Sequence, residues 1–193
     1  MIPPGATASK PQPSFATERL LLRPFQYTDG ADVERLAGDR LIADTTKHIP
    51  HPYPEGAAAE WIATHADLWA NGTGAPFAVV ERATDTLVGG IGLVIDDASR
   101  SAELGYWIGV PHWNKGHASE AGRAVLAFGF RLGLHRIEAR HLTRNPASGR
   151  VMQKLGMTFE GILREATRKW DTYEDLAVYS ILDREWEAAQ VAG

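Results

Sequence analysis

The stretch that decides the fold of this chain runs from Arg100 to Gly133 and reads RSAELGYWIGV, PHWNKGHA, SEAGRAVLAFGFRLG. Its first part alternates as a β-strand does, and one face carries Leu104, Tyr106, Ile108 and Val110. Its last part has apolar residues at the spacing of one helical face: Ala121, Val125, Phe128 and Leu132. The stretch therefore predicts a central strand, a short turn and the N-terminus of a helix.

The turn between this strand and this helix has the chemistry of an anion site. Pro111 ends the strand, because its nitrogen cannot donate to a sheet ladder. The first N–H groups of a helix lack partners within it and carry a partial positive charge. A phosphate could bind the amides of the run Lys115, Gly116, His117, Ala118 and Ser119. On these residues alone, an ordinary strand–helix turn that contains a glycine is an equally good interpretation.

The composition narrows the class of protein. The chain has 193 residues, a formal net charge of −4 and no cysteine. The charge gives no reason to expect nucleic-acid binding, and the lack of cysteine excludes disulfides and thiolate chemistry. No run approaches the roughly 18 apolar residues of a membrane span, and no signal-peptide pattern is seen. We expect a cytoplasmic protein with one domain over residues 17–189. The proline-rich residues 1–16 should form a disordered or loosely docked tail.

The rest of the chain mixes strand and helix patterns. Together with the central strand, about seven strands are predicted, the others at 17–25, 76–81, 87–95, 136–141, 158–165 and 172–182. Helices are predicted at 29–38, 55–71 and 147–155, with a last turn at 183–189 and a proline-punctuated loop at 44–54. Because strands come both as hairpins and between helices, we expect a layered α+β fold with a mixed sheet.

Four stretches together resemble the GNAT N-acetyltransferases, and more narrowly their RimJ/RimL-type branch, which acetylates ribosomal-protein N-termini. They are ERLLLRPF (18–25), AELGYWIG (102–109), PHWNKGHASEA (111–121) and NPASGRVMQKLGMTFEGILRE (145–165). The resemblance covers most of the chain from about Thr17 to Leu182 and implies a mostly antiparallel sheet, splayed at its middle and flanked by about four helices. It also implies acetyl-CoA as co-substrate, attacked directly by a primary amine, with no metal.

The resemblance assigns the cofactor-binding residues. The loop around Gly116 and Ala118 would cradle the pyrophosphate, and Trp113 stands where many family members have Gln or Arg. The strand backbone at Ile108 and Val110 would align the pantetheine and polarise the carbonyl, with a bulge near Gly109. Asn145 would bond the pantetheine arm, although unaided it is typical of a turn before proline.

The resemblance also points to an acid and a base. Glu103 is the first candidate for the base, acting directly or through one water, and a substrate-orienting or surface carboxylate is the alternative. Glu165 is a weaker candidate that is more typical of an exposed strand charge. Met152 occupies the position of the family's usual tyrosine acid, so Ser148 is predicted to serve the departing sulfur, with a helix-capping role as the alternative.

The sequence contains fewer signals for the residues that bind the acceptor amine. We predict substrate contacts for Trp107, Trp170 and Glu160, of which Glu160 is a further candidate base. The expected acceptor is a protein N-terminal α-amino group, and a small-molecule amine such as an antibiotic or polyamine is the alternative. A non-catalytic acyl-CoA-binding module stays open, because Met152 cannot donate a proton. We expect no nucleic-acid or membrane partner, and a homodimer is one assembly that we consider.

Overall fold

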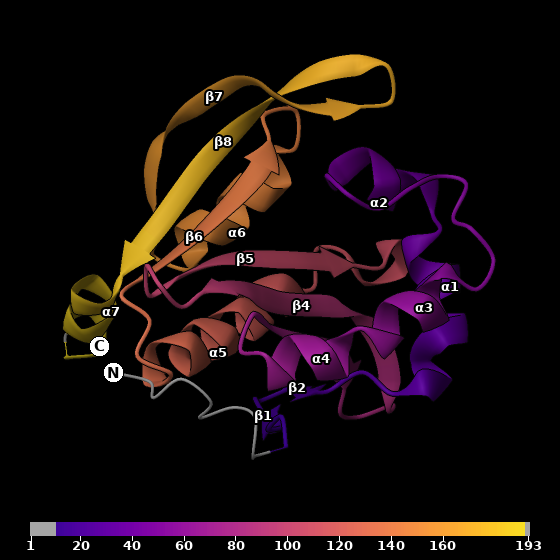
Figure 1. Cartoon of the computed structure of the whole chain (residues 1–193), viewed down its shortest axis with the longest axis horizontal. Coiled ribbons are helices and arrows are strands. Elements are labelled where there is room, and N and C mark those ends of the chain that lie inside the picture. The colour runs from indigo at the N-terminus through magenta and orange to yellow at the C-terminus, as the bar shows by residue number, and fades with distance from the viewer. Residues whose placement is uncertain (1–10, 192–193) are drawn as a thin grey trace.

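An eight-stranded sheet runs through the computed structural model, which describes residues 11–191 (Figure 1). Its order is β1-β2-β3-β4-β5-β6-β8-β7, and only the β5–β6 pair is parallel. The strands are β1 (Phe15–Ala16), β2 (Leu20–Arg23), β3 (Gly74–Glu81), β4 (Thr86–Asp96), β5 (Ser101–Ile108), β6 (Arg136–Leu142), β7 (Thr158–Lys169) and β8 (Thr172–Leu182). The predicted α+β fold with a mixed, mostly antiparallel sheet is confirmed.

The sheet opens between β5 and β6. These two strands pair over three positions only, from Ser101 opposite Arg136 to Glu103 opposite Glu138. Beyond Glu103, β5 continues to Ile108 with β4 on its other edge and no further pairing to β6. The β4–β5 register is unbroken and Gly109 follows the strand, so the predicted bulge is absent from β5. The splay predicted for the middle of the sheet therefore comes from two strands that diverge.

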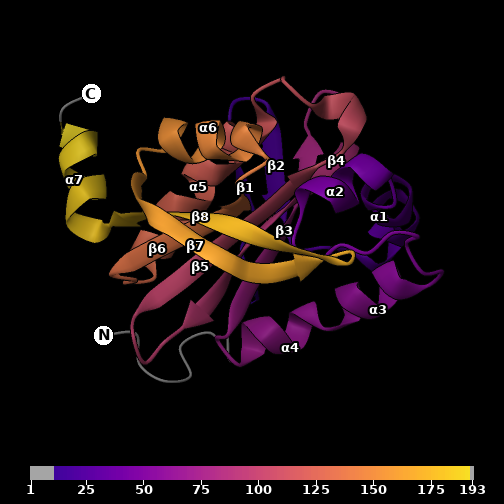
Figure 2. The same cartoon turned by 90° about the horizontal axis from the view of Figure 1, so that it is seen from above.

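Helices cover both faces of the sheet. They are α1 (Gly30–Ala37), α2 (Arg40–Thr45), α3 (Ala57–Ala63), α4 (His65–Ala70), α5 (His117–Arg131), α6 (Pro146–Lys154) and α7 (Asp183–Val191), with 3₁₀ turns η1 (Tyr27–Asp29) and η2 (Val110–His112). Figure 2 shows α5 and α6 on one side of the strands and α3 and α4 on the other. Within residues 11–191, none of the helices combines the length and the apolar character needed to cross a bilayer.

Two of these helical segments differ from the sequence prediction. The helix expected at 55–71 is two helices that meet at Thr64. Helix α2 was not predicted, and it enters the segment expected to be a loop. The Asp39 carboxylate starts it by accepting a hydrogen bond from the Leu41 amide at 2.8 Å. This is ordinary N-cap chemistry, which short helices need because they contain few internal hydrogen bonds.

The hydrophobic core lies mainly around β3, β4 and α5. Phe77 and Leu126 are fully buried there. Phe15 packs against it, with its ring centroid 5.0 Å from that of Phe77 and 5.7 Å from that of Phe128. Phe15 and Ala16 also pair with β2 as strand β1, so they belong to the sheet and not to the expected tail. Residues 1–10 of that tail lie outside the described residues.

Candidate active site

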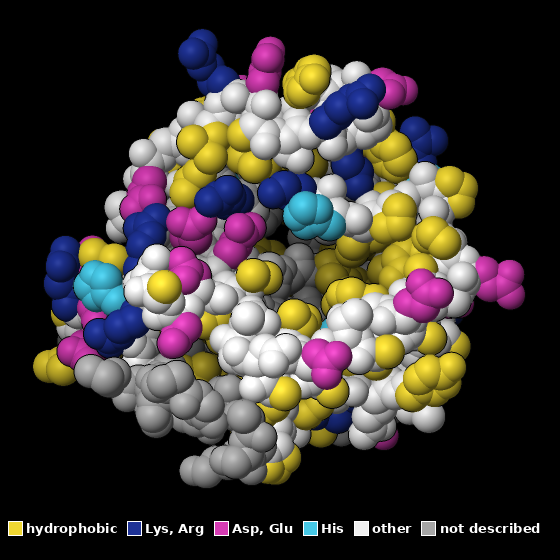
Figure 3. Space-filling model, in the orientation of Figure 1, with side chains coloured by type: hydrophobic (Ala, Val, Ile, Leu, Met, Phe, Trp, Pro, Cys, Tyr) yellow, Lys and Arg dark blue, Asp and Glu magenta, His cyan; other side chains and the backbone are white. Residues whose placement is uncertain are grey.

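A cleft of about 860 Å³ passes through the opening of the sheet. Its walls come from β4, β5, the N-terminal ends of α5 and α6, and the helices α1 to α4. Figure 3 shows a hollow near the middle of this face, with charged side chains above it and hydrophobic ones to its right. Most of the predicted site residues line this cleft: Glu103, Trp107, Ile108, Gly116, His117, Ala118, Ser119, Asn145 and Ser148. Val110, Lys115, Glu160 and Trp170 do not.

The loop before α5 is shaped for close backbone approach. Asn114 and Gly116 both have left-handed backbones, with φ of +59° and +83°. The Trp113 indole donates to the Ile108 carbonyl, which fixes the loop against the end of β5. A left-handed residue next to a right-handed one turns neighbouring amides toward one concave point, and here the left-handed Gly116 lies at the N-terminus of α5. The missing side chain of Gly116 leaves room for a pyrophosphate, so the loop fits the cofactor that the resemblance implies.

Arg19, which lies between β1 and β2, holds the backbone of this loop. Its Nη1 donates to the Lys115 carbonyl at 2.8 Å, and its guanidinium pairs with the Glu120 carboxylate at 2.7 Å. A Cβ on Gly116 would lie 3.2 Å from Arg19 Nη2. The N-terminal ERLLLRPF stretch therefore supports the α5 loop directly, which explains why the two motifs act together.

Two basic side chains of α6 add positive charge to the cleft, whereas the histidine of the loop adds none. His117 is only 2% exposed, and burial lowers the pKa of its imidazole, so the ring is neutral at neutral pH. Arg150 and Lys154 lie one helical turn apart on α6 and both line the cleft. Within the described residues their side chains have no hydrogen-bond or ion-pair partner. Sequence reasoning missed this pair, which the four-residue spacing on a predicted helix could have indicated.

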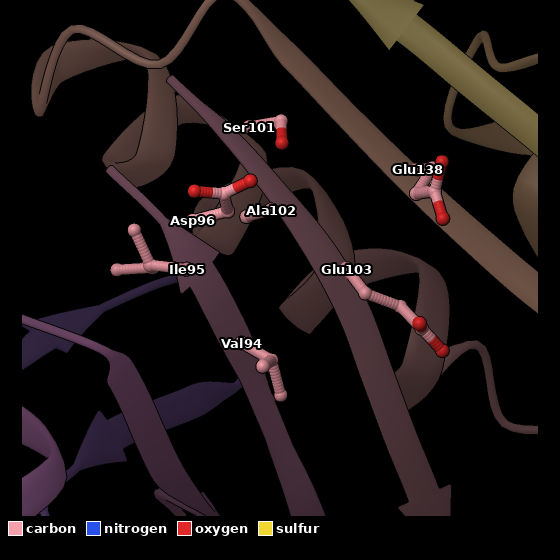
Figure 4. Close-up of a pocket in the computed structure, with 7 residues that line it drawn as sticks. All are labelled: Val94, Ile95, Asp96, Ser101, Ala102, Glu103 and Glu138. Carbon is pink, nitrogen blue, oxygen red and sulfur yellow. The ribbon is translucent and has the colours of Figure 1, made fainter. Parts of the chain in front are cut away.

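Glu103 lies where β5 and β6 separate. Its side chain is 40% exposed, and its carboxylate is 3.9 Å from Arg140 Nε. Arg140 is held more tightly by Glu138, whose carboxylate is 2.6 Å away. Glu103 and Glu138 also line a second hollow of about 230 Å³ at the ends of β4 and β5, which Figure 4 shows. Glu103 is thus open to the cleft and only loosely paired, which leaves it available for proton transfer.

The other predicted carboxylates lie elsewhere. Glu160 forms two hydrogen bonds of 2.6 Å with Arg136 and accepts one from Ser180. The Arg136 guanidinium is the main reason that the pKa of Glu160 falls to about 2. Glu165 lies in an irregular part of β7, and its amide donates to Asp175 at 2.8 Å. Neither side chain lines the cleft, so neither enters the proposal below.

Trp170 also lies away from the cleft lining. It stands at the tip of the β7–β8 hairpin, where its indole N–H donates to the Asp44 carboxylate at 3.0 Å. The neighbouring Lys169 ammonium donates to the Ile49 carbonyl at 2.6 Å. These contacts join the hairpin to α2 and the segment after it, which is a role that no local pattern indicates.

Ser148 and Asn145 meet at the start of α6. The Asn145 side chain caps the helix by accepting from the Ser148 amide at 3.3 Å, and its Nδ2 donates to the Thr45 carbonyl at 3.1 Å. The Asn145 amide donates to the Leu142 carbonyl, so Ser148 does not complete a capping box. The Ser148 hydroxyl instead lies 2.7 Å from the hydroxyl of Tyr106 on β5. Asn145 thus has both side-chain polar atoms engaged within the protein.

Aromatic residues from α3, α4 and the segment after β2 form one wall of the cleft. Phe25, Trp61 and His65 pack edge to face, with ring centroids 4.3 to 5.2 Å apart. Trp107 lines the cleft from β5 and leaves no room for a side chain at Gly90, whose Cβ would lie 2.8 Å from Trp107 Nε1. Gly90 of β4 therefore permits close packing of Trp107.

Comparison with known proteins agrees with this geometry. Residues 19–158 match the model of the acetyltransferase (GNAT) domain family. The N-acetyltransferase YnaD of Bacillus subtilis is 35% identical over 174 residues, which span 89% of this chain and 98% of that protein. The ribosomal-protein-serine acetyltransferase of Escherichia coli is 32% identical over 98 residues, half of this chain and 55% of that one.

A solved GNAT acetyltransferase from Bacillus anthracis superposes with a TM-score of 0.78 at 28% identity, over 89% of this chain and 99% of the other. The match to the family model covers well over half of the chain. This chain belongs to the GNAT family of acetyltransferases, and it is an N-acetyltransferase of that family.

Proposed function

We propose that this enzyme transfers the acetyl group of acetyl-CoA to the α-amino group of a protein N-terminus, such as that of a ribosomal protein. The observation that carries the proposal is the meeting of three groups in one cleft: the α5 loop at Gly116, the carboxylate of Glu103 and the hydroxyl of Ser148. In this family acetyl-CoA supplies the activated acetyl thioester. The rest of the chemistry falls to residues of this chain.

The loop and α6 hold the cofactor in this proposal. The amides of Gly116 to Ser119 would bind the pyrophosphate, with Arg150 and Lys154 adding charge. The edge of β5 from Leu104 to Ile108, which β6 leaves unpaired, offers backbone groups to the pantetheine arm. Because these groups are held by packed elements, they need little reorganisation when the cofactor binds.

Glu103 acts as the base. The pKa of an α-amine is near 8, so removing its proton at neutral pH is a modest task for a carboxylate, directly or through one water. The amine nitrogen then bonds to the thioester carbonyl carbon and gives up one further proton to solvent, while the carbon–sulfur bond breaks with its electron pair going to sulfur. Ser148 offers its hydroxyl to that sulfur.

The charges of the cleft favour an acceptor with a single positive group. Among the described residues that line it, Glu103 is the one acidic side chain, whereas Lys47, Arg140, Arg150 and Lys154 are basic. With Arg150 and Lys154 assigned to the pyrophosphate and Arg140 paired with Glu138, Lys47 remains to repel an acceptor with several positive charges, such as a polyamine or aminoglycoside. The ribosomal-protein-serine acetyltransferase among the relatives supports a peptide acceptor. Newly made proteins are found in the cytoplasm, which is the location that we propose for this enzyme. The homodimer stays a prediction.

The test is acetyl-CoA turnover, followed as free-thiol release, with N-terminal peptides, polyamines and aminoglycosides as acceptors. We expect release with peptides. Glu103→Gln should lower kcat/KM about 100-fold and flatten its rise with pH, whereas Glu160→Gln, outside the cleft, should change neither. Release with small amines alone would move the acceptor to the alternative class. Binding of CoA without turnover of any acceptor would favour the non-catalytic module.

A further inference from the structure

Tyr106 is the residue of the cleft that neither the motifs nor the family comparison assigns. It lies on β5, where strand alternation predicts a core position, and its ring is largely buried. Its hydroxyl, however, reaches the cleft beside Ser148. A buried tyrosine hydroxyl needs a hydrogen-bond partner, and here the partner is the hydroxyl of Ser148, the proposed catalytic serine.

We infer that Tyr106 is a positioning residue that donates to the Ser148 oxygen and so directs the Ser148 proton into the cleft, toward the departing sulfur. The inference rests on the proposed function and goes beyond it by assigning a second hydroxyl. A serine hydroxyl has one proton and two lone pairs, and its proton rotates to suit its neighbours. When Tyr106 donates to that oxygen, the serine proton cannot point back at Tyr106 and is free for another acceptor.

The distances permit this direction of donation, and the acidity of the two hydroxyls favours it, because a phenol is a stronger hydrogen-bond donor than an aliphatic alcohol. Tyr106 Oη lies 2.7 Å from Ser148 Oγ and 3.1 Å from the Ser148 carbonyl oxygen. The shorter contact has the usual length of an O–H···O hydrogen bond. The Ser148 carbonyl belongs to the first turn of α6, where it faces the amide four residues further on. The Ser148 hydroxyl, at the shorter distance and on the cleft side, is the acceptor that we assign to the Tyr106 proton.

Two further features hold the pair in place. Burial raises the pKa of Tyr106 to about 12, so its phenol keeps its proton across the working range of the enzyme. Asn145 fixes the backbone of Ser148 through the cap of α6 and ties it to the end of α2. Tyr106 and Asn145 thus restrain the side chain and the main chain of Ser148 from opposite sides. No proton leaves Tyr106: its role is to orient and polarise the serine that stabilises the thiolate.

The test is a double-mutant cycle on the full-length enzyme. Ser148→Ala should lower kcat about 100-fold and Tyr106→Phe about 10-fold, with little change in KM for acetyl-CoA. The double variant should match Ser148→Ala, because Tyr106 acts through Ser148. Tyr179→Phe is the matched control. It removes another mostly buried hydroxyl that faces α6, near Gln153 and outside the cleft lining, and should leave kcat unchanged.

Two readouts separate orientation from simple loss of structure. With acetyl thioesters of more acidic thiols, the effect of Tyr106→Phe should shrink, since their thiolates need less stabilisation. In the complex with CoA, ultraviolet titration of the thiol should give a lower pKa in the wild type than in Tyr106→Phe or Ser148→Ala. Multiplicative losses in kcat, or an unchanged thiol pKa in Tyr106→Phe, would overturn the inference. Wild-type turnover and CoA binding report on the proposed function separately, so the two failures are distinguishable.

Discussion

The two halves of the sheet, β1–β5 and β6–β8, differ most in the burial of the edge strand β7. In the first half, β3 and β4 are buried along most of their length between α5 on one face and the α1–α4 helices on the other. In the second half, β7 is exposed along most of its length, with Phe159, Ile162 and Leu163 each 44 to 54% exposed. Hydrophobic burial stabilises β6 and β8 as it does β3 and β4, whereas the Arg136–Glu160 ion pair links the exposed β7 to β6.

Those charges form a continuous series across the opening of the sheet. Arg140 lies between Glu103 and Glu138, and Arg136 lies between Glu138 and Glu160. The carboxylates deep in the second half are therefore satisfied by arginines, and only Glu103, at the edge of the first half, is loosely paired. In this protein, the carboxylate that stays available for chemistry near the cleft is Glu103, which lies at the end of this series of ion pairs.

The largest expected effect concerns the loop that the first half presents. Gly116→Glu puts a carboxylate where we place the pyrophosphate, and the left-handed φ of +83° strains any side chain there. We expect CoA affinity to fall by about 100-fold or more in calorimetry, since apposed like charges cost several kcal/mol. Gly156→Glu is the control, because it has the same strain at φ +79° outside the cleft lining. Wild-type affinity in Gly116→Glu would remove the phosphate assignment.

A pair of leucine truncations measures the contrast in burial. Leu126 on α5 is fully buried, whereas Leu163 on β7 is 44% exposed. Leu126→Ala should lower the free energy of unfolding by about 2–5 kcal/mol, and Leu163→Ala by about 0.5 kcal/mol or less. Urea denaturation of both variants gives the two values. Equal losses would mean that β7 depends on hydrophobic packing as much as the core does.

Acidification should weaken the first half before the second. Burial lowers the pKa of His65 from 6.5 to about 4, so below pH 6.5 the unfolded chain binds a proton that the folded protein refuses. Stability should fall as the pH drops from 6.5 to 4, by up to about 3 kcal/mol from this group. His65→Phe keeps the aromatic packing and should reduce this fall, measured as the urea midpoint against pH. An unchanged slope would assign the effect to other histidines.

The smallest effect is expected in the ion pairs of the second half. Arg136 keeps the pKa of Glu160 near 2, so the pair stabilises the fold above pH 4.5, and the contribution is lost as the pH falls toward 2. Because the Glu160 side chain is 39% exposed, solvent screens the pair, and Glu160→Gln should cost about 1 kcal/mol or less at neutral pH. The same urea series, extended to lower pH, checks this. A loss above about 2 kcal/mol would show that the network acts as a unit.

Much of the first half could be predicted from local pattern. The alternation in β5, the amphipathic α5 and the glycine between them are short-range signals, and they located the loop that lies at the cleft. Helix α2 and the C-terminal end of β7 were missed, because a single cap residue and an irregular register leave weak traces in composition. Trp170 and Glu160 were expected near the acceptor because they are aromatic or acidic, yet each already has a partner distant in sequence.

The sequence by itself determined the strand, turn and helix around Gly116, because these depend on residues a few positions apart. It also determined the mixed sheet and the family, because these depend on the order of such local patterns along the chain. Only the tertiary structure decided which polar side chains are free. It brought Tyr106 to Ser148, 42 positions along the chain, and Asn145 to Thr45, 100 positions away. It also paired Glu160 with Arg136 and left Glu103 at the opening. Hydrogen bonds and ion pairs depend on the distance between atoms in space. For residues far apart in the sequence, that distance is set only when the chain folds.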